Sequence, residues 1–232
     1  MAANFARHDF ASREELAAAL TSVVAAQLDE AIASRGKAVL AVSGGSTPAL
    51  FFKTLSQAAL DWAKVVVTLV DERFVAETSP RSNAALVKAN LLQDRAAAAR
   101  FLPLASPLED IAQATSVAEV ALRLFGLPLD VVVLGMGNDG HTASFFPDAD
   151  ELEQVLDVST PRLVSPVHAA SADEPRLTLT LPVIASARFI ALHIEGAEKQ
   201  ETLERALSRG GALPIRRVID AAETPVEIFW AA

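Results

Sequence analysis

The stretch KAVLAVSGGSTPALFFKTL, residues 37–55, decides the fold of this chain. Its first part is a continuous apolar run, which is typical of a strand buried on both faces. The glycines of SGG then predict a turn, and Thr47 and Pro48 predict the N-cap and the first residue of a helix over ALFFKTL. The expected unit is a strand, a loop of the size that holds a phosphate group, and a helix.

The same alternation continues along the chain. A capping box at Ser12 and Glu15 opens a helix that ends at Gly36. Strands are predicted over residues 65–73, 101–104, 130–137, 162–167, 176–181, 189–196 and 226–231, and helices over residues 82–92, 116–126, 182–187, 198–211 and 213–219. Because apolar strands alternate with helices, we expect an α/β fold with a mostly parallel sheet covered by helices on both faces.

Composition narrows the class of protein. The 232 residues show no linker and no internal repeat, so we expect one domain over residues 1–232. The net charge of −9 disfavours nucleic acid or an anionic membrane as a partner, and the lack of cysteine excludes disulfides, thiolate metal sites and cysteine nucleophiles. The start, MAANFARHDFASREE, lacks the apolar core of a signal peptide, so we expect a cytoplasmic protein.

Four polar loops follow predicted strands or their turns, over residues 43–47, 71–73, 135–141 and 195–199. Ligands of parallel α/β sheets bind beyond the carboxyl ends of the strands, so we expect these loops to meet at one edge. The first loop offers hydroxyls, glycines and the start of a helix, which suit a phosphate group; its residues are Ser43, Gly44, Gly45, Ser46 and Thr47. An ordinary glycine turn explains the same five residues equally well.

The stretch LGMGNDGHTASFFP, residues 134–147, carries two groups suited to acid–base chemistry. His141 can accept a proton from water near neutral pH, and Asp139 can orient it or stabilise its charged form. The three glycines also match the spacing of a dinucleotide-binding turn, but Pro147 leaves little room for the helix which that motif requires. We therefore expect this loop to carry chemistry and not a nucleotide.

Other motifs are absent or open to two interpretations. The sequence contains no G-x-S-x-G and no H-E-x-x-H, so neither a serine nucleophile nor a metal site is predicted, and we expect no cofactor. His193 is interpreted as a core or strand-end residue. Asp71 and Arg73, after a strand, and Arg176 and Lys199 are each explained as solvated charges when taken alone, but they are candidates for an anion site when taken together.

The chain resembles the 6-phosphogluconolactonase family over almost its whole length. The resemblance rests on SGGSTP, VDERFV followed by SPRSN, GMGNDGHTASFFP, RLTLTLPVI and GAEKQETL in this order. The related glucosamine-6-phosphate deaminases share the modified Rossmann-like sheet and the GxGxDGH loop, but that loop is followed by a short segment ending in a catalytic glutamate. Here the segment is TASFFP, without a carboxylate, which favours the lactonase over the deaminase.

The resemblance implies hydrolysis of 6-phospho-D-glucono-1,5-lactone in the oxidative pentose phosphate pathway. It implies that His141 is the general base, that Asp139, Asp71 and Arg73 surround the sugar, and that residues 43–47 with Arg176 and Lys199 hold the phosphate. The roles of Arg81 and Asn83 stay open, as does the function of Asp139 as an orienting or a sugar-binding group. A deaminase and a non-catalytic sugar-phosphate-binding module remain alternatives, and we expect a monomer or a small homo-oligomer.

Overall fold

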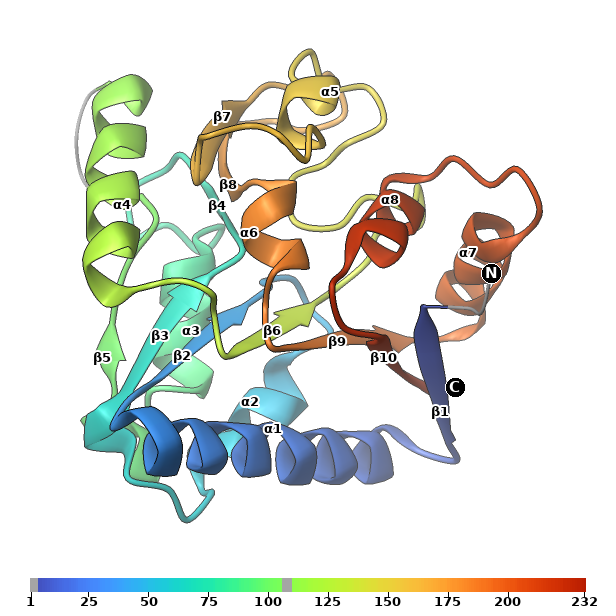
Figure 1. Ribbon diagram of the computed structural model, residues 1–232. Coiled ribbons are helices and arrows are strands. Elements are labelled where there is room, and N and C mark those ends of the chain that lie inside the picture. Colours follow the sequence, from blue (N-terminus) through green and yellow to red (C-terminus); the bar gives the residue numbers. More distant parts are fainter. Residues whose placement is uncertain (1–3, 106–109) are drawn as a thin grey trace.

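The computed structural model describes residues 4–105 and 110–232; residues 1–3 and 106–109 of the predicted domain lie outside the described residues. Its main element is a seven-stranded sheet in which all paired strands are parallel (Figure 1). In spatial order the strands are β1 Phe5–Phe10, β10 Val226–Ala231, β9 Phe189–Glu195, β6 Val131–Leu134, β2 Ala38–Val42, β3 Val65–Leu69 and β5 Arg100–Phe101. The predicted α/β class with a mostly parallel sheet is confirmed.

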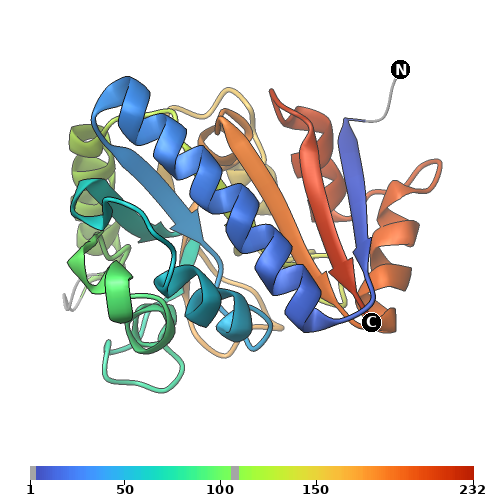
Figure 2. The same ribbon diagram turned by 90° about the horizontal axis from the view of Figure 1, so that it is seen from below.

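Helices cover both faces of this sheet. They are α1 Arg13–Arg35, α2 Ala49–Ser56, α3 Asn83–Asn90, α4 Ile111–Phe125, α5 Leu152–Val155, α6 Leu181–Ala185, α7 Ala197–Leu207 and α8 Pro214–Ala221, with short 3-10 turns at Trp62–Lys64 and Asp94–Ala98. Figures 1 and 2 show α1 and α2 on one face of the sheet, with α1 running roughly along the direction of its strands, while α6 and α8 lie on the other face.

The first helix follows the predicted signals at both ends. The Ser12 side chain accepts the backbone N–H of Glu15, and Gly36 closes the helix in the left-handed conformation with φ 76°. By length and composition α1 is apolar enough to cross a membrane. Its fully buried side chains, among them Leu20 and Leu28, form the stripe that packs on the rest of the fold.

The predicted single strand over residues 65–73 is wrong, because the chain changes sheets at Val70. The backbone N–H of Val70 donates to Val42 in the large sheet, whereas its carbonyl accepts the N–H of Leu179. The last part becomes β4 Asp71–Arg73, which pairs antiparallel with β8 Arg176–Leu179, and β8 pairs antiparallel with β7 Val164–Val167. A second, three-stranded sheet therefore lies beside the carboxyl edge of the large one.

Sequence reasoning also missed one strand and misplaced one helix cap. The edge strand β1 was not predicted, because FARHDF carries three polar residues in a row, has no buried residue, and pairs with β10 at the edge of the sheet. Thr47 does not cap α2: Pro48 occupies the N-cap position, no side chain caps the helix, and the helix begins at Ala49. Thr47 instead lines a cavity, described below.

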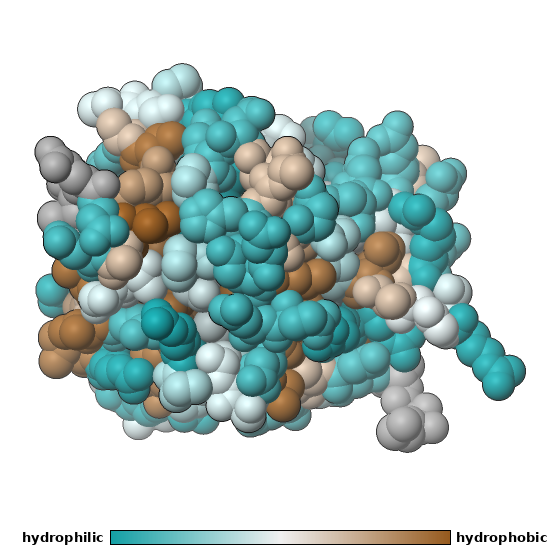
Figure 3. Space-filling model, turned by 90° about the horizontal axis from the view of Figure 1, so that it is seen from above, coloured by the Kyte–Doolittle hydropathy of each residue, from teal (hydrophilic) through white to brown (hydrophobic). Residues whose placement is uncertain are grey.

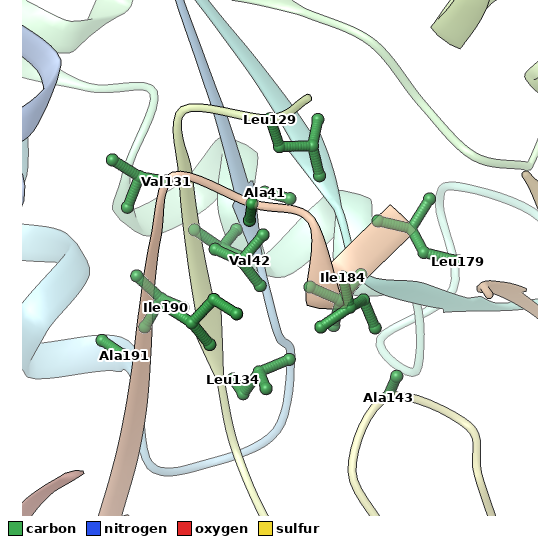
Figure 4. Packing of buried hydrophobic residues seen from close by; sticks show 14 of the residues in the cluster. Ala41, Val42, Leu129, Val131, Leu134, Ala143, Leu179, Ile184, Ile190 and Ala191 are labelled. Atoms are coloured by element: carbon green, nitrogen blue, oxygen red, sulfur yellow. The ribbon is translucent and has the colours of Figure 1, made fainter. Parts of the chain in front are cut away.

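The core joins the two sheets. Figure 4 shows Val42, Leu134 and Ile190 of the large sheet gathered with Ile184 of α6 and Leu179 of the small sheet, and all five are fully buried. The face seen in Figure 3 is mostly hydrophilic, with apolar residues in separate groups. The small sheet is thus fixed firmly beside the ends of β2 and β6, where the functional loops begin.

Candidate functional site

A cavity of about 210 Å³ lies at the carboxyl ends of β2, β6 and β9. The neighbouring strands β2 and β6 lead away to opposite sides of the sheet, so the cavity lies at a topological switch point, where ligands of such folds bind. The predicted convergence of four loops is confirmed. The residues predicted for the site that line this cavity are Ser43, Gly44, Gly45, Ser46, Thr47, Asp71, Arg73, His141, Arg176 and Lys199.

The loop over residues 43–47 is held in place by both neighbouring segments. The Ser43 hydroxyl accepts the N–H of Gly135 at 2.9 Å, which joins the loop after β2 to the loop after β6. Gly45 has φ 94°, and a Cβ on Gly44 would lie 1.9 Å from Oδ1 of Asn83. Both positions therefore require glycine, and the loop leads directly into the positive end of α2.

Two arginines face each other across the small sheet beside this loop. Arg73 and Arg176 are direct partners in the antiparallel β4–β8 register, and Arg176 is only 8% exposed. Burial lowers the pKa of Arg176, while nearby Asp71 raises it. Because like charges in direct register destabilise a sheet, this arrangement favours an anion bound near both guanidinium groups.

Lys199 adds a third cation to the cavity. It lies in the first turn of α7, and its ammonium group donates to the carbonyl of Met136 at 2.5 Å. Burial lowers the pKa of Lys199, and the carboxylates of Glu195 and Asp139 offset part of this effect. In a chain of net charge −9, three cations therefore line a single cavity that one carboxylate, Asp71, also lines.

His141 and Asp139 form a hydrogen-bonded pair. Nδ1 of His141 lies 2.6 Å from Oδ1 of Asp139, and the imidazole ring is 4.5 Å from the ring of Phe146. Burial raises the pKa of Asp139, but the hydrogen bond and charge of His141 outweigh it and leave that pKa lowered. His141 lines the cavity and Asp139 contacts its Nδ1, so the carboxylate is placed to orient the imidazole and leave Nε2 for a ligand.

Two glycines of the loop over residues 135–141 make backbone hydrogen bonds within the loop that carries His141. The N–H of Gly137 donates to the carbonyl of His141, and the N–H of Gly140 donates to that of Gly137. These donors are used within the loop, and the next helix after Gly140 begins only at Leu152. Both observations oppose a pyrophosphate site here, in agreement with the expectation from Pro147.

In the segment VDER, residues 70–73, some side chains line the cavity and one stabilises the fold. Asp71 lines the cavity, whereas the carboxylate of Glu72 accepts the backbone N–H groups of Asn83 and Ala84 at 2.7 Å each, at the start of α3. Burial raises the pKa of Glu72, although these backbone hydrogen bonds lower it. Glu72 is thus part of the scaffold that fixes β4 against α3.

The structure also places the two residues whose roles were left open. Asn83 lines the cavity, donates to the carbonyl of Asp71 at 2.9 Å and contacts Gly44, so it joins two of the site loops. Arg81 is half exposed and pairs with Asp173 and Glu174 at 2.8 and 2.7 Å. Arg81 thus lies outside the lining of the cavity.

His193 is a lining residue that sequence reasoning missed. It is 3% exposed, as expected of a core or strand-end residue, but it also borders the cavity, and its Nε2 lies 3.1 Å from Glu195. Its position near the carboxyl end of β9 was the available signal.

Comparison with known proteins defines the class first. A family model described as glucosamine-6-phosphate isomerases/6-phosphogluconolactonase matches residues 11–230, and the chain belongs to this family. The description names two kinds of enzyme, and both names refer to a phosphorylated sugar or sugar acid.

The similar proteins then point to one branch. The chain is 60% identical over 222 residues to a 6-phosphogluconolactonase of Mesorhizobium japonicum, covering 96% of this chain and 93% of that protein. It is 51% identical over 233 residues to the 6-phosphogluconolactonase of Rhizobium meliloti, covering 100% of both. The crystal structure of a 6-phosphogluconolactonase from Shewanella baltica matches with a TM-score of 0.94 and 41% identity, covering 98% of each chain. The expected resemblance is confirmed.

Proposed function

We propose that this protein hydrolyses 6-phospho-D-glucono-1,5-lactone to 6-phospho-D-gluconate, the lactone-opening step of the oxidative pentose phosphate pathway, without a metal ion. The observation that carries the proposal is one cavity lined by three cations and by His141, whose Nδ1 is hydrogen-bonded to Asp139. The cations suit a phosphate, and the imidazole suits the activation of water. The names of the similar proteins support the same substrate.

In the proposed mechanism His141 is the general base. Its Nε2 takes a proton from water as the water oxygen attacks C1 of the lactone, and Asp139 stabilises the imidazolium that forms. Arg73 or a backbone N–H of the loops stabilises the oxyanion. The oxyanion then collapses, the bond from C1 to the ring oxygen breaks, and the imidazolium returns its proton to that oxygen. The product is the open-chain acid, which releases a proton to water.

The phosphate serves to position the lactone. In this proposal residues 43–47, Arg176 and Lys199 bind the phosphate, and Asp71 and Arg73 contact the sugar. Binding energy from a remote group can lower the barrier by orienting the reacting carbon, without any contact to it. Since lactones of this kind also open spontaneously in water, the proposed site needs no covalent intermediate.

Replacing the base tests the mechanism. His141→Ala should lower kcat by about two to four orders of magnitude while substrate still binds, because the proton acceptor is lost and the cations remain. Turnover is measured on lactone freshly generated by a dehydrogenase and corrected for spontaneous hydrolysis. His168→Ala is the matched control, since that histidine is exposed and bonds to Glu151 outside the cavity lining. Near wild-type turnover in His141→Ala would falsify the general-base assignment.

The family description also covers glucosamine-6-phosphate isomerases, so the deaminase activity is a second candidate. The segment that follows His141, residues 142–147, contains no carboxylate that could replace the glutamate expected of that branch. Its Ser144 contacts Asp71 and its Phe146 packs against His141. Ammonia release from glucosamine 6-phosphate measures this activity directly, and we expect none above background.

A further inference from the structure

Ser144 connects the loop that carries His141 to the carboxylate of Asp71. It is fully buried, and its hydroxyl donates to Oδ2 of Asp71 at 2.7 Å. Its own backbone N–H donates to the hydroxyl of Thr178 on β8 at 3.2 Å. A buried hydroxyl aimed at a carboxylate that lines the cavity is a strong, charge-assisted contact.

The backbone before Ser144 is held in an uncommon conformation. Ala143 has φ 49°, in the left-handed region that residues other than glycine rarely adopt. Such conformations persist only where the surroundings fix them, and here Phe145, which follows, is fully buried. The turn over residues 142–146 is therefore fixed by packing, with Ser144 directed at Asp71.

This contact leaves one carboxylate oxygen of Asp71 for a ligand. Oδ2 accepts Ser144 and the backbone carbonyl accepts Asn83, but within residues 4–105 and 110–232 no hydrogen bond reaches Oδ1. An ionised carboxylate only accepts hydrogen bonds. The partner that suits Oδ1 in the cavity is thus a donor, such as a hydroxyl group of a sugar.

We propose that Ser144 is a positioning residue that fixes Asp71 so that its free oxygen accepts a hydrogen bond from a hydroxyl group of the bound sugar. The inference rests on the proposed lactonase function. It assigns to the segment TASFFP, residues 142–147, a task in substrate recognition.

A double-mutant cycle tests this role. Ser144→Ala should lower kcat/KM about tenfold, because Asp71 loses the donor that holds it. In an Asp71→Ala background the same change should alter kcat/KM by less than about twofold, since Ser144 acts only through Asp71. Ser144→Cys keeps the volume with a much weaker donor and repeats the test if Ser144→Ala folds poorly. Ser165→Ala, a buried serine on β7 outside the cavity lining, is the matched control.

The same four proteins are also compared by their dissociation constants for 6-phosphogluconate, measured by calorimetry, because this measurement needs no turnover. Inhibition by inorganic phosphate should stay within about twofold of wild type in Ser144→Ala, because the phosphate contacts are made elsewhere. Equal losses from Ser144→Ala in both backgrounds, or an Asp71→Ala variant with wild-type kcat/KM, would overturn the inference while the lactonase function stands. A wild-type protein without lactonase activity would remove the proposed function and this inference together.

Discussion

Replacing Arg176 by methionine separates function from stability in one variant. Arg176 is 8% exposed, lies opposite Arg73 in the β4–β8 register, and its guanidinium carbon is 5.4 Å from the centre of the Phe146 ring. Methionine retains an apolar stem against Phe146 and removes the charge. If Arg176 binds the phosphate, the variant loses a charged hydrogen bond worth about 1.5–3 kcal/mol, which corresponds to a rise in KM of about 10- to 150-fold.

The same change should not destabilise the fold. Like charges in direct register cost about 0.2–1 kcal/mol, so their removal should raise the melting temperature by about 0.4–4 °C in a chain of this size. Initial rates on fresh lactone give KM and kcat, and thermal melts with and without inorganic phosphate give stability and binding. Wild type should gain more stability from phosphate than the variant does. Arg209→Met, an exposed arginine, is the control. An unchanged KM, with phosphate stabilising both proteins equally, would remove Arg176 from the phosphate site.

Three further predictions follow from the site. Because burial lowers the pKa of Lys199, affinity for inorganic phosphate, measured by calorimetry, should begin to fall at a lower pH than an ordinary lysine would cause, and should decline by about tenfold as Lys199 loses its proton. In Lys199→Arg the affinity should stay flat over the same alkaline range, and parallel profiles would contradict this. A Cβ on Gly137 would lie 2.3 Å from the His141 ring, whereas the atom nearest to a Cβ on Gly135 would be 3.7 Å away. Gly137→Ala should therefore displace His141 and lower kcat about 100-fold, and Gly135→Ala should lower kcat far less. Equal losses of kcat in the two variants would refute the argument. Glu72→Ala should lower the free energy of unfolding by about 2–4 kcal/mol in urea, because buried backbone N–H groups lose their acceptor; a loss below about 1 kcal/mol would exclude that role.

Much of the fold could be predicted because apolar runs define the buried strands. Continuous runs such as VVVTL and VVVL mark strands covered on both faces, and the polar residues after them mark the edge where ligands bind. The order of the strands then brings the loops after β2 and β6 together. For this reason the cavity-lining residues from four loops were predictable before their positions were known.

The features of the structure that were not predicted from the sequence share a different physical cause. The strand β4 follows β3 with only Val70 between them, and its pairing with β8 joins residues about a hundred positions apart, which no local pattern encodes. The same holds for the hydroxyl of Ser144 on Asp71 and for Asn83 against Gly44. These contacts depend on which way a side chain points in the folded chain, and that is fixed by packing.

The most direct test of the central claim is the lactonase assay on the purified wild-type protein. Fresh 6-phospho-D-glucono-1,5-lactone is supplied by a dehydrogenase, and the appearance of 6-phosphogluconate is followed against the spontaneous rate. The account predicts hydrolysis well above that rate, saturable in substrate, inhibited by inorganic phosphate and unaffected by a chelator. A rate equal to the spontaneous one, from protein that is folded and binds 6-phosphogluconate, would contradict it.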